Sequence, residues 1–491
     1  MVWSQPPYHG KPWLGKLAVI GLAASSSSPS TSSSSTSSSS SSSSIRLQAP
    51  HPELKPSERL AALGEICDNN DRNIEGLNQN EWDVYGDFHK SSDESFLRHF
   101  ESTVASEFGF DDAVFMPSGV MGQSIALLIH HENWKQQQEQ QEMKTPQNKK
   151  FACHPTSHLL LHENEGFRHL CGFDVAVIKE NKPNNSDGSN DNNKGLGLDG
   201  EPLRYDHLND DFQHTLGGWD EDISTLIVEL PHRELGGKIT PWEDILKIRQ
   251  FLDKQQVPFH CDGARIFEAT SGYDNRSLRE LSEPFDSMYI SFYKGLGGLA
   301  GGMLLGNTAF CDKARTMLRQ FGGNLYTLLP YIASAWDGYQ QNWVLPNKSK
   351  DKSIENGDVS GSINLLSFQE KKEKLVRIVS ELSSMDDSFC RIARFEPKVP
   401  HVPMIHLYLK PTVEECNKMR DEILAEYNVC IFHRLRPVDP QDSVAKTNGF
   451  QSVLELSIGQ SNGSVPDETW ISSWRKFSER LSCTLTPSQT S

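Results

Sequence analysis

The fold is decided by Ser291-Phe292-Tyr293-Lys294-Gly295-Leu296-Gly297-Gly298, together with the earlier stretch His260-Cys261-Asp262-Gly263-Ala264-Arg265. Lys294 closes an apolar run over 288–293 and opens a glycine-rich turn, so its ammonium group is expected at the end of a strand. Asp262 follows a second apolar run, 257–261, which also predicts a strand. The sequence therefore predicts an amine and a carboxylate at the ends of two strands.

This pair of groups indicates a cofactor. A lysine held in partly apolar surroundings has a lowered pKa and can form a Schiff base with an aldehyde. A carboxylate at the position of Asp262 can pair with a protonated pyridine nitrogen. Together they form the arrangement that pyridoxal 5'-phosphate (PLP) requires. Either residue alone would also fit an ordinary role, Lys294 as a solvated lysine and Asp262 as a helix cap, so the prediction rests on the pair.

The motifs also carry a family resemblance. Asp262-Gly263-Ala264-Arg265, followed by Ser-x-x-Lys294-Gly-Leu-Gly, resembles the threonine aldolase and β-eliminating lyase family of fold-type I PLP enzymes. The resemblance implies an α/β fold, in which a large domain with a mostly parallel sheet carries a small α+β C-terminal domain. It also implies a homodimer or homotetramer. Independently, strand and helix patterns alternate from Ser224 through Lys294, with a helix predicted over 242–255, which favours a mostly parallel sheet.

A small-residue turn marks a candidate phosphate site. It joins a buried strand, 113–116, to an apolar helix, 124–130, and free backbone N–H groups at such a helix start can bind an anion. An ordinary strand-to-helix turn is the alternative. The resemblance implies that the turn binds the PLP phosphate through Ser118, Gly119, Val120 and Gly122. Val120 carries no hydroxyl, so at this position the backbone N–H would bind.

Two histidines are further candidates. The resemblance implies that His158 stacks on the PLP ring and that Glu163 matches an acidic position of the family. His232 follows the predicted strand 224–230 and matches the family's second active-site histidine, near the β-hydroxyl of the substrate. Parallel strands place ligands at such C-terminal ends, although a plain turn residue is the alternative. His154 and His162 fit a helix face, and no carboxylate stands at metal-ligand spacing beside these histidines, so no metal site is predicted.

Four residues are candidates for substrate binding. Arg265 is implied to contact either the cofactor O3′ or the substrate carboxylate. Tyr85 is a second candidate. Arg434 and Arg436 could hold a carboxylate, since a guanidinium binds it with two hydrogen bonds, or they could be solvated loop residues.

Two departures from the family leave the substrate open. The family places a carboxylate-binding arginine on the strand that matches 453–457, and this chain has none there. The family's early Arg-Ser-Asp-Thr segment also has no clear counterpart before Trp82. The exact substrate and its stereochemistry therefore stay undetermined at this stage.

Composition bounds the remaining possibilities. A chain of 491 residues suggests two structured domains with additions. Its net charge of −17 would repel nucleic acid and anionic membranes, and no apolar stretch is long enough to span a bilayer. Nine scattered cysteines without a CxxC pair argue against disulfides and zinc, and favour a reducing compartment.

Low-complexity segments set the expected boundaries. Residues 1–52 are expected to form a serine-rich disordered segment, which fits either a plain low-complexity tail or a targeting peptide. The cytoplasm is the predicted compartment, and a targeting peptide would make the mitochondrion or the plastid the alternative. The large PLP-binding domain is expected over 53–346, with a polar insertion near 135–150 that forms either a helix extension or a loop, and a loop insertion near 180–200. A flexible insertion over 347–363, the small domain over 364–482 and a tail over 483–491 are expected to follow.

The resemblance implies a reaction. A PLP-dependent lyase of this family would cleave a β-hydroxy amino acid by a retro-aldol reaction, giving glycine and an aldehyde. Two alternatives stay open: β-elimination from another amino acid, and a PLP-binding scaffold that performs no aldol cleavage.

Overall fold

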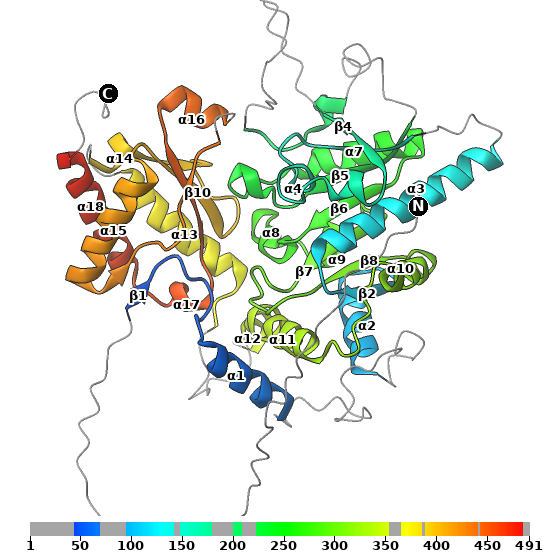
Figure 1. The fold of residues 1–491 in the computed structure, drawn as a ribbon, viewed down its shortest axis with the longest axis horizontal. Helices are drawn as coiled ribbons and strands as arrows, with labels where there is room; N and C mark the ends of the chain where they lie inside the picture. The colour runs from blue at the N-terminus through cyan, green and yellow to red at the C-terminus, as the bar shows by residue number, and fades with distance from the viewer. Residues whose placement is uncertain are drawn as a thin grey trace, which may run out of the picture. The chain divides into compact units, whose positions relative to one another are not determined.

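The computed structural model describes residues 44–68, 95–141, 148–178, 200–208, 222–352, 365–384, 388–439 and 442–484. A seven-stranded sheet organises the residues up to 352, and a four-stranded sheet organises those from 365 onward (Figure 1). Within these ranges no helix combines the length and the apolar character needed to cross a membrane.

The large sheet is mostly parallel, as predicted. Its strand order is β2-β8-β7-β6-β5-β3-β4. Strand β8 runs antiparallel to both of its neighbours, and the other pairs are parallel. The bounds are β2 Asp112–Met116, β3 Lys149–Cys153, β4 Phe173–Val177, β5 Ile223–Glu229, β6 Phe259–Gly263, β7 Ser287–Ser291 and β8 Gly302–Gly306.

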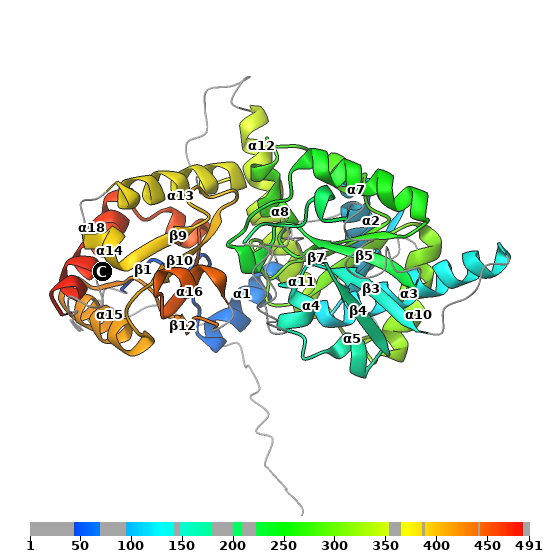
Figure 2. The ribbon, with the colours of Figure 1, turned by 90° about the horizontal axis from the view of Figure 1, so that it is seen from above.

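Helices cover both faces of this sheet (Figure 2). Leu226 and Val228 of β5 belong to the apolar cluster that holds the inner face of α7 (Trp242–Gln255). Ile227, whose side chain points to the opposite face, packs with Leu127 of α3 (Gly119–Gln140). Because successive strand residues alternate between faces, helices on both sides cover the side chains of both faces, and all seven residues of β5 are buried.

The helical predictions differ in accuracy. Helix α7 has the predicted bounds, since Ile245, Ile248 and Leu252 recur at helical spacing and are buried. Helix α3 begins earlier than the predicted 124–130 and continues through the polar residues up to Gln140. The other helices of this part are α2 Phe96–Phe108, α4 His158–Leu161, α5 Gly166–His169, α8 Ile266–Ala269, α9 Leu278–Ser282, α10 Thr308–Gln320, α11 Leu329–Tyr339 and α12 Leu345–Lys352, with 3₁₀ turns at Tyr205–Leu208, Arg233–Leu235 and Thr270–Gly272 and a π-helical turn at Gln340–Val344.

The C-terminal part has its own antiparallel sheet, in the order β12-β13-β10-β9. Its core is separate and includes Trp470, Trp474 and Phe477. Its elements are α13 Phe368–Ser383, α14 Ser388–Ile392, β9 Ala393–Glu396, β10 Met404–Leu409, α15 Val413–Tyr427, β11 Val429–Cys430, β12 Arg436–Pro437, α16 Ser443–Asn448, β13 Ser452–Ser457, α17 Gln460–Gly463 and α18 Asp467–Thr484.

The expectation that residues 1–52 form one disordered segment needs correction for residues 44–52. Strand β1 (Ile45–Arg46) pairs in parallel with β11. Leu47 is fully buried in the C-terminal core, and the Gln48 amide donates to backbone oxygens of Arg434 and Glu455. These contacts lie far apart in the sequence and so leave no local signal. Helix α1 (Pro56–Asp68) follows.

Two other expected boundaries are affected. Residues 347–352, expected to open a flexible insertion, belong to α12, and residues 483–484 of the expected tail belong to α18. Residues 135–140, near one predicted loop insertion, continue α3. Residues 353–363 of the expected insertion lie outside the described residues. Residues 180–199 of the expected loop and Tyr85 also lie outside them.

Candidate active site

The two residues that anchor the prediction lie on neighbouring strands. Asp262 is the fourth residue of β6, which pairs in parallel with β7, and Lys294 follows the end of β7. Burial, helped by the nearby Arg265 guanidinium, lowers the pKa of Lys294 to about 8. Such an amine is neutral far more often near neutral pH than an ordinary lysine, which favours attack on an aldehyde.

Asp262 is buried and forms no ion pair with any of the described residues. Burial, reinforced by the neighbouring Glu229 carboxylate, raises the pKa of Asp262 to about 7. Among the described residues, its side chain accepts a hydrogen bond from the backbone N–H of Ala264, at 3.1 Å from Oδ1. A protonated pyridine nitrogen beside Asp262 would supply the missing positive charge, so this carboxyl group fits the ring nitrogen of PLP.

His158 lies close enough to Asp262 for their charges to interact. Its Nδ1 donates to Glu163 Oε1 at 3.1 Å, and this bond raises the pKa of His158 above its usual value. The backbone N–H of His158 donates to Glu229 Oε2 at 3.2 Å. Glu163 therefore orients the imidazole, whose side chain is one third exposed, and Glu229 holds the backbone of His158 in place.

His232 occupies a different, buried position. Its Nε2 lies 2.9 Å from Thr156 Oγ1, and its ring centroid lies 4.5 Å from that of His154. His154 is itself buried, with its Nε2 donating to the Glu201 carbonyl at 3.0 Å, rather than on an exposed helix face. No contact between His232 and Lys294 or Asp262 is seen among the described residues, so its role in proton transfer stays a prediction.

The predicted phosphate turn opens α3. Ser118 is the N-cap, and its side chain makes no capping hydrogen bond, which leaves the first N–H groups of the helix available to an anion. A Cβ atom at Gly119 would lie 2.7 Å from the hydroxyl of Tyr289, and one at Gly122 would lie 3.1 Å from the same ring. The packing of Tyr289 therefore leaves no room for a side chain at Gly119 and little room at Gly122. Val120 can offer only its backbone, as expected.

The Tyr289 hydroxyl strengthens the case for an anion here. It is buried and meets no partner with hydrogen-bonding geometry among the described residues, although the Tyr293 phenol lies nearby. A buried hydroxyl without a partner costs about 1–3 kcal/mol. A phosphate at the start of α3 is the type of acceptor that such a donor lacks.

Glu455 was not anticipated as a site residue. It stands on β13, the strand on which the resemblance places an arginine. Its Oε1 accepts from Arg265 Nη2 and its Oε2 accepts from Arg233 Nε, each at 3.0 Å. Burial alone would raise the pKa of Glu455, but Arg265 and Arg233 outweigh it and hold the pKa at about 2. The absence of an arginine at 453–457 was the one sequence signal that could have drawn attention to it.

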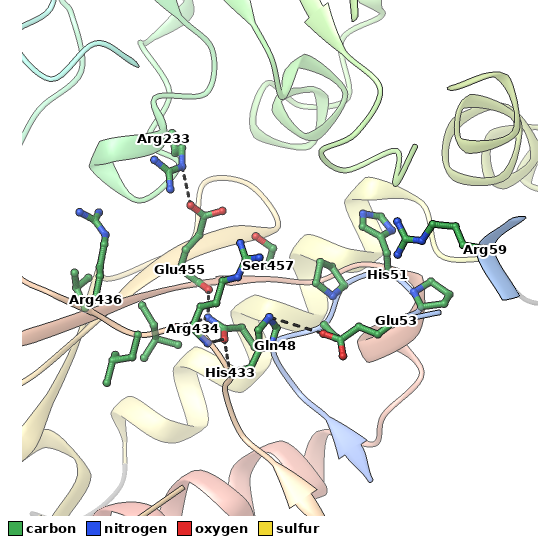
Figure 3. Close-up of a pocket in the computed structure, with 16 residues that line it drawn as sticks. Gln48, His51, Glu53, Arg59, Arg233, His433, Arg434, Arg436, Glu455 and Ser457 are labelled. Carbon is green, nitrogen blue, oxygen red and sulfur yellow. Dashed lines mark hydrogen bonds and ion pairs between the residues drawn. The ribbon is translucent and has the colours of Figure 1, made fainter. Parts of the chain in front are cut away.

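A cavity of about 530 Å³ lies beside these groups (Figure 3). Residues 48–53 form one wall of the cavity. In this wall, His51 Nε2 donates to the carbonyl oxygen of Lys294 at 2.8 Å. The structure brings Arg434 and Arg436 to this cavity, as predicted for substrate contacts, but their function stays a prediction. The lining residues are Gln48, Ala49, Pro50, His51, Pro52, Glu53, Arg59, Arg233, His433, Arg434, Leu435, Arg436, Val453, Leu454, Glu455 and Ser457.

Comparison with known proteins gives consistent results. A family described as "Beta-eliminating lyase" matches residues 83–372, more than half of the chain. The low-specificity L-threonine aldolase 1 of Arabidopsis thaliana is 24% identical over 255 residues, which cover 52% of this chain and 62% of that protein. The low specificity L-threonine aldolase of Saccharomyces cerevisiae is 27% identical over 225 residues, covering 46% and 50%. This chain therefore spans less than two thirds of the length of these relatives.

A solved structure extends the likeness over most of the chain. A protein of Listeria monocytogenes EGD-E, provisionally described as an L-allo-threonine aldolase, has a TM-score of 0.64 and 27% identity. The alignment covers 89% of this chain and 96% of that one. The α/β architecture is thus the fold-type I fold, as predicted from the motifs around Asp262 and Lys294.

Proposed function

This chain belongs to the β-eliminating lyase family, and on that premise we propose that it is a PLP-dependent lyase acting on a β-hydroxy amino acid. The reaction proposed is retro-aldol cleavage to glycine and an aldehyde. The names of the aligned aldolases support this choice within the family. The observation that carries the proposal is the pairing of a low-pKa lysine with a buried, uncompensated carboxyl group on adjacent strands.

The residues present fit the cofactor. Lys294 would hold the aldehyde, Asp262 the pyridine nitrogen, and the start of α3 the phosphate. When bound, PLP supplies an electron sink for the carbon whose bond breaks. Asp262 would keep the ring nitrogen protonated, because its own ionised form is stable only beside a positive charge.

Other side chains orient the substrate and move protons. Arg265, fixed by Glu455, would bind the α-carboxylate through its remaining N–H groups. His158, held by Glu163, would cover the ring and exchange a proton with the substrate. Lys294, whose pKa is lowered to about 8, would accept a proton as the neutral amine and, as the ammonium, would donate one to the α-carbon.

A direct assay tests the proposal. Purified protein supplied with PLP should develop the visible absorbance of the bound cofactor, and Lys294→Ala should abolish it. With L-threonine or L-allo-threonine, release of acetaldehyde would support aldol cleavage, whereas ammonia with 2-oxobutanoate would indicate elimination. Bound PLP with neither product, across a panel of β-hydroxy amino acids, would leave the binding scaffold as the correct description.

Assembly and compartment stay predictions. A homodimer or homotetramer is expected from the family, and light scattering of the purified protein would test it. The cytoplasm is the predicted compartment, with mitochondrion or plastid as alternatives that fluorescent fusion of the full chain would distinguish.

A further inference from the structure

The cavity beside Lys294, named here the arginine cavity, has an unusual charge for this chain. Four arginines line it, together with His51 and His433, and only Glu53 and Glu455 oppose them. The protein as a whole carries a net charge of −17. A cavity of positive charge in a strongly acidic protein attracts and concentrates small anions. The arginines are Arg59, Arg233, Arg434 and Arg436.

Only part of this positive charge is neutralised. Arg233 bonds Glu455 and Glu234, and Arg436 lies 3.0 Å from Glu234. Glu53, the other acid, pairs with Arg46 and lies 3.8 Å from His433. Among the lining arginines, Arg59 and Arg434 have no neutralising carboxylate within the described residues.

Arg59 and Arg434 carry the uncompensated charge. Both are exposed, and neither forms an ion pair with any residue in the described ranges. Arg434 is held by its backbone, because its N–H donates to the Gln48 side chain and its carbonyl accepts from the same amide. Its side chain is directed toward Glu455 and Ser457, and Arg59 lies beside His51 (Figure 3). Within the described part of the chain, the cavity is thus flanked by two guanidinium groups that have no ion-pair partner.

The arginine cavity adjoins the reactive groups. His51 lines it and bonds the backbone of Lys294. Glu455 lines it and bonds Arg265. A substrate held at Lys294, with its α-carboxylate on Arg265, would therefore have the cavity as a neighbour. Its apolar wall includes Leu435, Val453 and Leu454, which suits the carbon chain of a ligand whose far end is charged.

We infer that the arginine cavity binds a second anionic group on the substrate, a carboxylate or a phosphate, at Arg434 and Arg59. This inference rests on the proposed function and specifies its substrate class as acidic β-hydroxy amino acids. The cleavage balances without a co-reactant. The Cα–Cβ bond breaks, its electron pair stays on Cα and takes up a proton, and the β-hydroxyl loses its proton to become the aldehyde carbonyl, so the aldehyde product keeps the anionic group.

Matched ligands isolate the effect of the second charge. Calorimetric titration of the PLP-loaded full chain would compare 3-hydroxyglutamate with 3-hydroxynorvaline. The two ligands carry the same α-amino and α-carboxylate groups, and the side chain of 3-hydroxynorvaline is uncharged. We expect 3-hydroxyglutamate to bind about tenfold more tightly, as one charge-assisted contact in a partly exposed cavity provides. A 4-phosphorylated 4-hydroxythreonine would show whether a phosphate binds better than a carboxylate.

Arginine variants identify the residue responsible. Arg434→Gln should reduce the preference for 3-hydroxyglutamate to less than about twofold, a loss consistent with removing one charge-assisted hydrogen bond. The control Arg475→Gln, an exposed arginine on α18 outside the cavity, should keep it. Equal affinity for both ligands in the wild type, or an unchanged preference in both Arg434→Gln and Arg59→Gln, would overturn the inference.

The charge preference is read as a ratio of binding constants if the PLP-loaded protein does not cleave the ligands, and as a ratio of kcat/KM values if it does. If no aldehyde forms but the charge preference is present and lost in Arg434→Gln, the proposed reaction fails while the anion site stands. If aldehyde forms with equal kcat/KM from both substrates and both bind equally, the reaction stands and the anion site fails.

Discussion

The carboxylate of Glu455 accepts a hydrogen bond from Arg265 Nη2 at 3.0 Å, which ties β13 of the C-terminal sheet to the turn after β6. The resemblance places a substrate-binding arginine on this strand, and the chain has an acid instead. Arg233 bonds the second oxygen of the same carboxylate. The charges around the predicted α-carboxylate site are thus rearranged, with Glu455 fixing two arginines that a substrate could meet.

Glu455 also influences the reactive amine. Its negative charge favours the ammonium form of Lys294, whereas Arg265 and Arg233 favour the neutral form. Glu455→Gln should therefore lower the pKa of Lys294 below about 8. The pH dependence of borohydride trapping of PLP on the protein would measure this change. Glu468→Gln, an exposed acid on α18 outside the cavity, is the control, and an unchanged or raised pKa in Glu455→Gln would contradict the assignment.

Asp262 should make the cofactor-free protein less stable as pH rises. Its pKa is raised to about 7 in the fold from an ordinary value of 3.8, so between these values the unfolded chain binds fewer protons and the free energy of unfolding falls with increasing pH. Asp262→Asn removes this titration. Urea unfolding without PLP should show the variant gaining stability relative to wild type, by a few kcal/mol at most, between pH 5 and pH 8.

The same comparison with saturating PLP provides a second test of Asp262. A protonated ring nitrogen would stabilise the ionised carboxylate, so wild type should gain more stability from PLP than Asp262→Asn does. Equal stabilisation of the two proteins would mean that Asp262 does not face the ring nitrogen.

Glu163 should control the titration of His158. The hydrogen bond to Glu163 is the main cause of the raised pKa of His158. This bond stabilises the folded protein fully below pH 6.5, and the stabilisation is lost as the pH rises through the raised pKa of His158. Glu163→Gln should lower the pKa of His158, as read from its imidazole proton resonance. If neutral His158 accepts a proton during turnover, the acidic limb of the kcat profile should move to lower pH by the same amount.

Gly119 should tolerate no side chain. A Cβ atom there would lie 2.7 Å from the buried Tyr289 hydroxyl, so Gly119→Ala should lower the free energy of unfolding by about 1–3 kcal/mol and weaken PLP binding. Adding Tyr289→Phe removes the nearest atom and should restore part of the stability. Gly64→Ala, on α1 with nothing within 4 Å of the added atom, is the control. Equal stability of the Gly119 and Gly64 variants would exclude this packing.

The sequence by itself determined the features that depend on local order. The alternation of strands and helices around Asp262 and Lys294, the bounds of α7 and the turn at Ser118 follow from periodicity and turn residues, which neighbouring positions display directly. Tertiary structure alone decided which distant residues meet: Glu455 with Arg265, 190 positions apart, and His51 with Lys294, 243 apart. Such pairs leave no periodic signal in the sequence. The packing of the two sheets brings the partners together, and the residues that lie between them in the sequence do not determine the contact.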